Sequence, residues 1–393
     1  MSIKTIDVFL STYGQEFFVG KLVYKSKVIY FEYDKAFLSK GIEISPYKLP
    51  SKSGVMVCDD ALFEGLFGVF SDSLPDGWGR LLLDRYFLKK EISYSDITPL
   101  DRLGYIGEYG IGALVYRPCI DAAINKIDEI NLDNLAHNSN KILLDNSSNN
   151  IEDFLHLGGS SAGARPKVMV QINEDNDIVS GSQKLKSGFK HYIVKFASSS
   201  DNTDIGKLEY IYSLMAKTSG IDMPNTKLLK GKKNSYFAIE RFDRIGDERV
   251  HIHSVAGMTH SDFRMPVLDY DDLLSLTLHL TKDINEVIKM YKLACFNLFS
   301  HNRDDHAKNF SFVLDINNLW KLSPAYDLTF SYGPGGEHST TYLGEGKNPT
   351  VKHLLKLAKA HNIQNPQIII EKVKSSVKDF SRLAKSLGVR YWE

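Results

Sequence analysis

The residues best suited to carry out chemistry lie in His301–Asn309 (HNRDDHAKN), between an apolar helical pattern and a strand pattern. Asp304 stands five residues before Asn309, and this arrangement suits phosphoryl transfer. An aspartate in such a loop accepts the proton of the attacking hydroxyl, and an asparagine oxygen holds a Mg²⁺ that bridges phosphate groups. Asp327, at the end of Leu322–Asp327 (LSPAYD), would supply a second oxygen ligand.

Two other interpretations of this segment remain open. The first is a solvated loop whose Asp and Asn side chains cap their own backbone. The second is a metal site with His and Asp ligands, although zinc would want more His at bonding spacing, whereas Mg²⁺ needs only one or two carboxylates together with phosphate. The combination of Asp304, Asn309 and the later Asp327 favours phosphoryl transfer, and its spacing is that of the catalytic loop of protein kinases.

A glycine-rich segment, Gly158–Lys167 (GGSSAGARPK), has the composition of a phosphate-binding loop. Its glycines free backbone N–H groups to surround phosphate, and Arg165 and Lys167 add positive charge. Two of the glycines have the G-x4-G spacing of nucleotide-binding P-loops, but Ala164-Arg165 stands where that motif has Lys followed by Ser or Thr. The segment therefore does not predict a P-loop NTPase, and a flexible hairpin loop is the alternative.

Two further positions carry residue types suited to nucleotide binding. Lys195 ends the apolar strand pattern HYIVKF (191–196), where a lysine either extends its charge to solvent or meets an anion such as a phosphate. Glu209, on the following helical pattern, is a conceivable partner, although an exposed surface glutamate is the favoured interpretation. Glu240–Arg244 (ERFDR) closes another strand pattern, where the backbone of 240–242 either hydrogen-bonds an adenine edge or belongs to an ion-paired crossover.

A β-rich part followed by a helical part must position these segments. The first 35 residues alternate in the manner of strands and predict an antiparallel meander. Residues 60–90 have helical spacing with a break at Pro75-Asp76-Gly77, which predicts two helices joined by a turn. Strand patterns recur at 166–172, 191–196 and 235–242, and helical spacing occupies 206–220 and most of the chain after about 268, apart from a β-like insert at 310–327. We expect the polar loops to lie in a cleft where the two parts join.

The composition excludes several protein classes. With 43% hydrophobic and 24% charged residues the chain is globular, which excludes collagen, disordered tails and coiled coils. The 48 basic and 48 acidic residues cancel, so DNA binding by the whole surface is disfavoured. Cys58, Cys119 and Cys295 lie far apart, which argues against a disulfide framework or a Cys-type zinc site. The sequence has neither a signal-peptide pattern nor an apolar run of about 18 residues, and we expect a cytoplasmic protein.

Taken in this order, the motifs resemble those of the HipA-like serine/threonine kinase toxins of bacterial toxin–antitoxin systems. The matching stretches are SSAGARPK (160–167), YIVKF (192–196), ERFDR (240–244), NRDDHAKNFSF (302–312) and LSPAYD (322–327). LPDGWGR (74–80) also resembles the N-terminal subdomain of that family, so the likeness covers nearly the whole chain.

The resemblance implies an α+β fold of the two-lobed, protein-kinase-like HipA type. In that fold a β-rich N-terminal lobe with an extra N-terminal subdomain is followed by an all-helical C-terminal lobe. We expect the N-terminal β-rich subdomain in residues 1–120, a linker rich in Asn, Asp and Ser in 121–152, the remainder of the nucleotide-binding lobe in 153–244, and the helical lobe with the catalytic loop in 245–393.

The resemblance also implies a role for each matching residue. Asp304 would be the catalytic base, Asn309 and Asp327 the Mg²⁺ ligands, and Lys195 the phosphate-binding lysine. The other nucleotide-binding residues would be Glu240, Phe242, His306, Tyr326, Ser161, Gly163 and Lys167. Ser160, or alternatively Ser161, would be the autophosphorylated serine, and its added negative charge would withdraw the glycine-rich loop from ATP.

The sequence departs from the family pattern at two places. Arg165-Pro166 stands where some relatives carry Gln-Glu, which puts the movement of the loop in doubt. Asp305 lies beside Asp304 and resembles the base in type, but the spacing to Asn309 selects Asp304.

The implied activity is ATP- and Mg²⁺-dependent phosphorylation of a serine or threonine in a cellular protein, with aminoacyl-tRNA synthetases as the best-known substrates of the family. The implied partner is a small helix-turn-helix antitoxin similar to HipB, through which operator DNA is contacted. A catalytically silent scaffold that binds antitoxin and operator DNA, and a small-molecule kinase, are the alternatives. Retention of Lys195, Asp304, Asn309 and Asp327 together favours an active enzyme.

Overall fold

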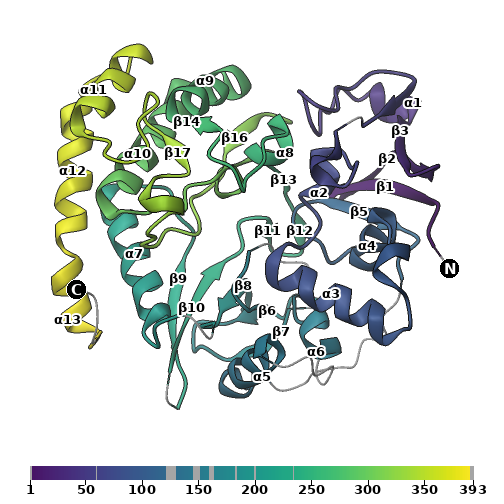
Figure 1. Ribbon diagram of the computed structural model, residues 1–393, viewed down its shortest axis with the longest axis horizontal. Helices are drawn as coiled ribbons and strands as arrows, with labels where there is room; N and C mark the ends of the chain where they lie inside the picture. The colour runs from purple at the N-terminus through teal and green to yellow at the C-terminus, as the bar shows by residue number, and fades with distance from the viewer. Residues whose placement is uncertain are drawn as a thin grey trace. The chain divides into compact units, whose positions relative to one another are not determined.

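The computed structural model describes residues 2–58, 60–120, 130–144, 151–158, 163–181, 184–198, 201–232 and 234–389 (Figure 1). The chain forms two compact units. Unit 1 comprises Met1–Thr203 and Leu228–His253, and unit 2 comprises Asp204–Lys227 and Ser254–Glu393. The backbone therefore passes from one unit to the other three times.

The first sheet of unit 1 is an antiparallel meander at the start of the chain. Its strand order is β4-β3-β2-β1-β5, with β1 at Thr5–Thr12, β2 at Gln15–Lys25, β3 at Val28–Tyr33, β4 at Val55–Val57 and β5 at Leu114–Arg117. Alternate residues Ile6, Val8 and Leu10 of β1 are fully buried, because successive side chains of a strand point to opposite faces. The predicted meander is confirmed.

The second sheet of unit 1 carries the glycine-rich segment at the start of one strand. Its order is β7-β6-β8-β10-β9, with β6 at Lys167–Ile172, β7 at Ile178–Ser180, β8 at Lys190–Lys195, β9 at Thr226–Lys230 and β10 at Ser235–Glu240. The short strands β11 (Arg244–Ile245), β12 (Glu248–Arg249) and β13 (His251–Ser254) follow.

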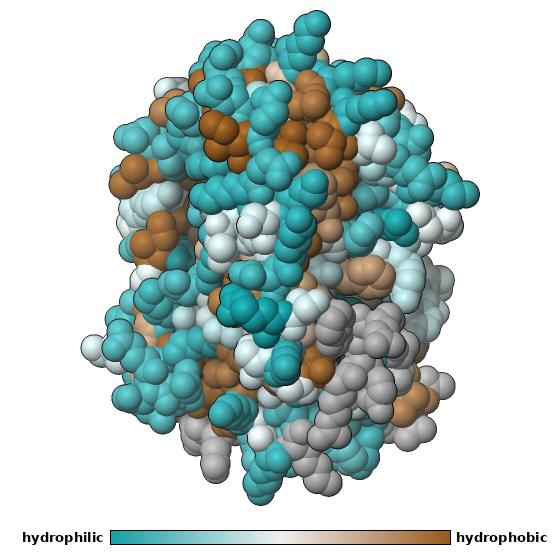
Figure 2. All heavy atoms as spheres, turned by 90° about the vertical axis from the view of Figure 1, so that its left-hand side faces the viewer, coloured by the Kyte–Doolittle hydropathy of each residue, from teal (hydrophilic) through white to brown (hydrophobic). Residues whose placement is uncertain are grey.

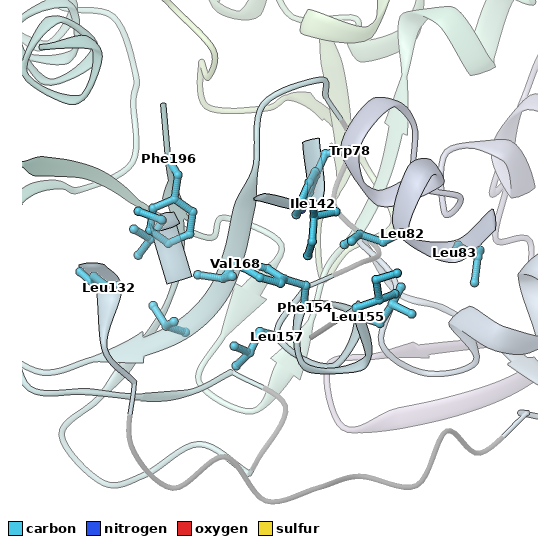
Figure 3. Packing of buried hydrophobic residues seen from close by; sticks show 14 of the residues in the cluster. Trp78, Leu82, Leu83, Leu132, Ile142, Phe154, Leu155, Leu157, Val168 and Phe196 are labelled. Atoms are coloured by element: carbon cyan, nitrogen blue, oxygen red, sulfur yellow. The ribbon is translucent and has the colours of Figure 1, made fainter. Parts of the chain in front are cut away.

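Helices α3 (Gly77–Lys89), α5 (Leu132–Leu144) and α6 (Ile151–His156) of unit 1 share one apolar core with this second sheet. The other helices of the unit are α1 (Lys35–Leu38), α2 (Gly68–Ser71) and α4 (Pro99–Ile106), of which α1 contacts β2, and α4 contacts β1 and β5 of the first sheet. Figure 3 shows Trp78 and Leu82 of α3, Phe154 of α6 and Val168 of β6 converging, all at most 1% exposed. Two helices separated by the Pro75-Asp76-Gly77 break, α2 and α3, confirm that prediction.

Helix α5 lies inside the stretch where the composition predicts a linker. Residues 121–129 and 145–150 of that stretch fall outside the described residues, but Leu132–Leu144 forms thirteen residues of helix. Leu132, Ala136 and Ile142 are buried in the core, with helical spacing that the abundant Asn and Ser residues obscure.

Unit 2 is mainly helical. Its helices are α7 (Ile205–Ser219), α8 (Val255–Thr259), α9 (Tyr270–Thr281), α10 (Ile284–Ser300), α11 (Val351–Ala360), α12 (Pro366–Lys378) and α13 (Phe380–Ser386). The expectation of an all-helical lobe is wrong, because the unit also contains β14 (Leu268–Asp269), β15 (Ser311–Leu314), β16 (Trp320–Leu322) and β17 (Thr340–Thr341). β15 pairs antiparallel with β16, and β14 pairs parallel with β17.

Helix α12 is amphipathic, with Ile370 and Val373 buried and Glu371 and Lys372 exposed. Figure 2 faces the side of the molecule on which α12 lies, and hydrophilic side chains cover much of that face between smaller apolar areas. Within the described residues, the helices are too short or too polar to cross a bilayer. The three cysteines are free thiols.

Candidate active site

The predicted catalytic loop follows the end of α10 in unit 2. His301 caps that helix in the left-handed conformation, with φ of 53°, and so turns the chain out of the helix. Three residues later the Asp304 side chain is 60% exposed, and His306 Nε2 lies 3.9 Å from its Oδ1. The Asp304 carboxylate is therefore accessible from solvent.

Asn309 closes this loop on itself. Its Nδ2 donates to the backbone oxygen of Asp304 over 2.6 Å, and its backbone N–H donates to the His306 oxygen over 2.8 Å. Because the amide nitrogen is committed to Asp304, the amide oxygen is directed away from that bond. The five-residue spacing thus joins the expected base and the expected metal ligand in one loop.

The segment that carries Asp327 is attached to the same loop through Tyr326. The Tyr326 hydroxyl donates to the Lys308 oxygen over 2.7 Å and lies 2.6 Å from Ser311 Oγ. Asp327 itself has φ of 56°, a left-handed conformation that a non-glycine residue adopts at some energetic cost. Such strain persists where the surroundings impose it, and it is common at ligand-binding positions.

These residues fit the donor set that Mg²⁺ prefers. Asn309 offers an amide oxygen and Asp327 a carboxylate, both hard oxygen donors. Among the described residues no three His, Cys, Asp or Glu side chains form a group that could hold a metal ion. A site made of Asn309, Asp327 and nucleotide oxygens is of a different kind from such a cluster.

Asp305, the neighbour of the expected base, has the opposite environment. Its side chain is fully buried and accepts hydrogen bonds from Tyr270 Oη, His338 Nδ1 and Ser339 N, each at 2.9 Å, and from Thr340 N at 3.2 Å. A carboxylate with four donors is fixed in place. Asp305 therefore holds the segment 338–340 against the loop.

The network around Asp305 continues into α10. Asn297 Nδ2 donates to Tyr270 Oη over 2.8 Å, and Asn302 Nδ2 donates to Asn297 Oδ1 over 3.0 Å. Sequence reasoning missed this support. His338 lies 33 residues from Asp305, and no local pattern indicates that the two meet.

In unit 1 two predicted phosphate-binding lysines lie side by side. Lys167 of β6 and Lys195 of β8 are directly opposite each other in the antiparallel register. Lys167 is only 6% exposed, and Lys195 Nζ lies 5.8 Å from the centre of the Phe237 ring. Residues directly opposite each other on neighbouring strands lie on the same face of the sheet, so the two predicted phosphate-binding lysines share one face.

The described part of the glycine-rich loop leads directly into Lys167. Gly163 has φ of 99°, which only glycine adopts readily. Arg165 forms a bidentate pair with Asp201, with distances of 3.0–3.2 Å. Burial raises the pKa of Asp201, but hydrogen bonds from Ser198 and the charge of Arg165 outweigh it and hold that pKa below its ordinary value. Ser160 and Ser161 lie outside the described residues.

The residues expected to contact adenine follow β10. Glu240 pairs with Lys190 at 3.1 Å, and Phe242 is half-buried. The backbone N–H of Arg241, between them, donates to the His191 oxygen over 2.8 Å. One of the backbone groups suggested for an adenine edge is therefore used within the protein.

The end of the ERFDR motif is an ion-paired cluster. Asp243 is buried and bonded to Arg241 and Arg244 at 2.6 and 2.7 Å, and it accepts from Gly112 N at 2.9 Å. Burial raises the pKa of Asp243, but the two arginines outweigh it and hold that pKa well below its ordinary value. This cluster joins the 241–244 segment to Gly112, just before β5 of the first sheet.

Glu209 differs from the favoured interpretation of an exposed surface residue. It lies on α7 of unit 2 and is only 4% exposed. That interpretation is wrong, and the helix that carries Glu209 packs against α12 and α13.

Comparisons with known proteins cover both parts of the chain. Residues 10–117 match the HipA N-terminal domain, and residues 159–381, more than half of the chain, match the HipA-like C-terminal domain. The putative kinase Y4mE of Sinorhizobium fredii is 26% identical over 184 residues, which are 43% of this chain and 41% of that protein. The match thus spans about two fifths of the length of this curated relative.

A solved structure supports the same fold. The HipA chain in the complex of HipA, HipB and operator DNA from the toxin–antitoxin system of Shewanella oneidensis MR-1 superposes with a TM-score of 0.68 and 17% identity. The match covers 99% of this chain and 92% of that chain. With an N-terminal and a C-terminal domain that both match, and a mixed α/β fold of the same kind, the chain belongs to the HipA family.

Proposed function

We propose that this chain is an ATP- and Mg²⁺-dependent serine/threonine protein kinase of the two-lobed type and the toxin of a toxin–antitoxin pair. One observation carries the proposal. In unit 2, Asn309 is bonded to the backbone of Asp304, and Tyr326 attaches the segment of Asp327 to the end of the same loop. A base and two oxygen ligands so arranged suit phosphoryl transfer.

The proposed reaction assigns a task to each group. The Asp304 carboxylate accepts the proton of a serine or threonine hydroxyl, whose oxygen forms a bond to the γ-phosphorus of ATP as the bond to the β,γ-bridging oxygen breaks and ADP leaves. Asn309 and Asp327 would hold Mg²⁺, which neutralises charge on the phosphates when bound. Lys167 and Lys195 of unit 1 bind phosphate oxygens as point charges.

The proposal includes self-regulation and partners. Ser160, or Ser161, is the proposed autophosphorylation site, because two added negative charges on a phosphate-binding loop would oppose ATP. A small helix-turn-helix antitoxin is the proposed partner and brings the chain to operator DNA. The formal net charge of zero agrees with DNA contact made by the antitoxin, and the structurally similar HipA is itself in a complex with HipB and operator DNA. The proposed substrate is a translation protein such as an aminoacyl-tRNA synthetase.

The first experiment measures transfer of labelled phosphate from Mg²⁺-ATP to the purified chain, followed by mass spectrometry of the modified residues. We expect labelling of Ser160 or Ser161 and its loss in Asp304→Asn. ATP binding without transfer to itself or to any protein of a cell extract would overturn the kinase proposal in favour of a silent scaffold. Transfer only to small molecules would instead indicate a small-molecule kinase.

A second experiment tests the lysine pair. Lys195→Met should weaken Mg²⁺-ATP binding, measured by calorimetry, because one phosphate-binding charge is lost. Lys190→Met is the matched control, since Lys190 lies on the same strand, is 59% exposed and pairs with Glu240. Equal loss in both variants would contradict the role of Lys195.

A further inference from the structure

The start of α3 contacts the described end of the glycine-rich loop through the backbone of one residue. The Gly163 N–H donates to the carboxylate of Asp76, and the Trp78 N–H donates to the Gly163 oxygen over 3.1 Å. Both polar groups of the Gly163 backbone are thus held by residues 87 and 85 positions earlier in the chain.

The Asp76 side chain contacts Gly163 in place of capping its own helix. Asp76 occupies the N-cap position of α3, where an aspartate normally accepts a hydrogen bond from the first turn of its own helix. Its side chain makes no such capping bond. The carboxylate accepts a hydrogen bond from the Gly163 N–H instead. Capping of α3 therefore does not explain why an aspartate stands at this position.

Gly77 allows the two backbones to approach this closely. Its φ is 46°, and a Cβ placed on it would lie 2.7 Å from both Ala164 Cα and the Gly163 oxygen. No real Cβ contact is that short, so any side chain at this position would displace the loop.

Trp78 extends the contact to α6, the helix that precedes the glycine-rich segment. Its side chain is 1% exposed and packs edge-on against Phe154 of α6 at 5.5 Å between ring centres (Figure 3). Helix α6 ends two residues before Gly158, where the glycine-rich segment begins. The start of α3 therefore contacts the helix that precedes the loop through Trp78, and the described end of the loop through Gly163.

We propose that Asp76–Trp78 is a positioning clamp that fixes Gly163, at the described end of the glycine-rich segment, and thereby sets the affinity of the protein for nucleotide phosphate. The clamp rests on the proposed function, because it acts through the loop and not on the nucleotide. A motif of the N-terminal subdomain thus controls the phosphate-binding step of the neighbouring domain.

The test compares Asp76→Ala with two variants. Asp76→Asn is the conservative variant, since its amide oxygen still accepts from Gly163 N–H. Asp34→Ala is the matched control: Asp34 caps α1 in the same unit and accepts from Ala36 N and Phe37 N at 2.9 and 3.1 Å, so its loss removes a cap without touching the loop.

The first readout needs no nucleotide. Hydrogen–deuterium exchange at the Gly163 amide should rise about tenfold in Asp76→Ala, since one hydrogen bond to a charged acceptor is lost. It should remain near the wild-type rate in Asp76→Asn and Asp34→Ala. Unchanged exchange in a folded Asp76→Ala would overturn the clamp.

The second readout is the dissociation constant of Mg²⁺-ATP from calorimetry. We expect it to rise about tenfold in Asp76→Ala, to recover in Asp76→Asn and to stay at the wild-type value in Asp34→Ala. Wild-type affinity in Asp76→Ala despite faster exchange would overturn the control of nucleotide binding by the clamp. A wild-type chain that binds no Mg²⁺-ATP would overturn the proposed function instead, while the exchange measurement still decides whether the clamp exists.

Discussion

Replacing Asp305 separates the roles of the two neighbouring aspartates of the loop. Asp305 is fully buried and accepts four hydrogen bonds, whereas the Asp304 side chain is 60% exposed. We expect Asp305→Ala to lower the free energy of unfolding strongly, because it leaves four buried donors without an acceptor. Asp304→Asn should leave stability near the wild-type value and abolish phosphate transfer.

The expected magnitude follows from the partners of each carboxylate oxygen. Oδ1 accepts from the backbone N–H groups of Ser339 and Thr340, and Oδ2 accepts from Tyr270 Oη and His338 Nδ1. Removing one partner of a buried polar cluster costs about 3–5 kcal/mol, and we expect about 4 kcal/mol for Asp305→Ala. In Asp305→Asn the amide oxygen still accepts from both backbone N–H groups, and the NH₂ group faces two side chains that are able to accept. We therefore expect a loss of about 1 kcal/mol in the free energy of unfolding.

The assay is urea-induced unfolding followed by circular dichroism, together with hydrogen exchange of α10 amides, which report on unit 2. Phosphate transfer is measured on the same samples. Wild-type stability in Asp305→Ala would refute the structural role of that carboxylate. Transfer that survives in Asp304→Asn but disappears in a folded Asp305→Asn would show that the base was assigned to the wrong aspartate.

Three further predictions concern unit 1. Phe154→Ala should lower the free energy of unfolding by about 3–5 kcal/mol in urea titration, since Phe154 is fully buried against Trp78, and a loss below about 1 kcal/mol would contradict this packing. Tyr116→Phe should lower the free energy of unfolding by about 1 kcal/mol in the same titration, because the buried hydroxyl donates to Ser73 Oγ over 2.7 Å. Burial lowers the pKa of His251 to about 4 from its ordinary 6.5. The unfolded chain therefore binds the extra proton, and stability falls by up to about 3 kcal/mol as pH drops from 6.5 to 4. His251→Gln should remove that part of the pH dependence, and an unchanged slope would refute it.

Local periodicity was sufficient to predict most of the elements. Strands β1 to β3 alternate with period two, and α10 and α12 have apolar residues at helical spacing, so their patterns are visible in the sequence. Helix α5 was not predicted, because its Asn and Ser residues obscure a short apolar face that becomes buried only when the core of unit 1 forms. Tertiary packing there outweighs composition.

In the candidate site, too, the sequence predicts the local contacts and misses the long-range ones. The loop from Asp304 to Asn309 closes through a bond between residues five apart, so spacing alone predicts it. The contacts of Asp305 with His338, and of Asp76 with Gly163, join residues 33 and 87 positions apart. Such contacts depend on the folded path of the chain, and a single sequence holds no local signal for them.

The three passages of the backbone between units constrain how the protein can be assembled on the ribosome. Helix α7 is made before unit 1 is complete, yet it packs against α12 and α13, about 150 residues later. At roughly 5–20 residues per second this helix waits on the order of ten to thirty seconds for its neighbours. Neither unit is a contiguous stretch of the gene, so a fragment cut at any single position leaves at least one unit without part of its core.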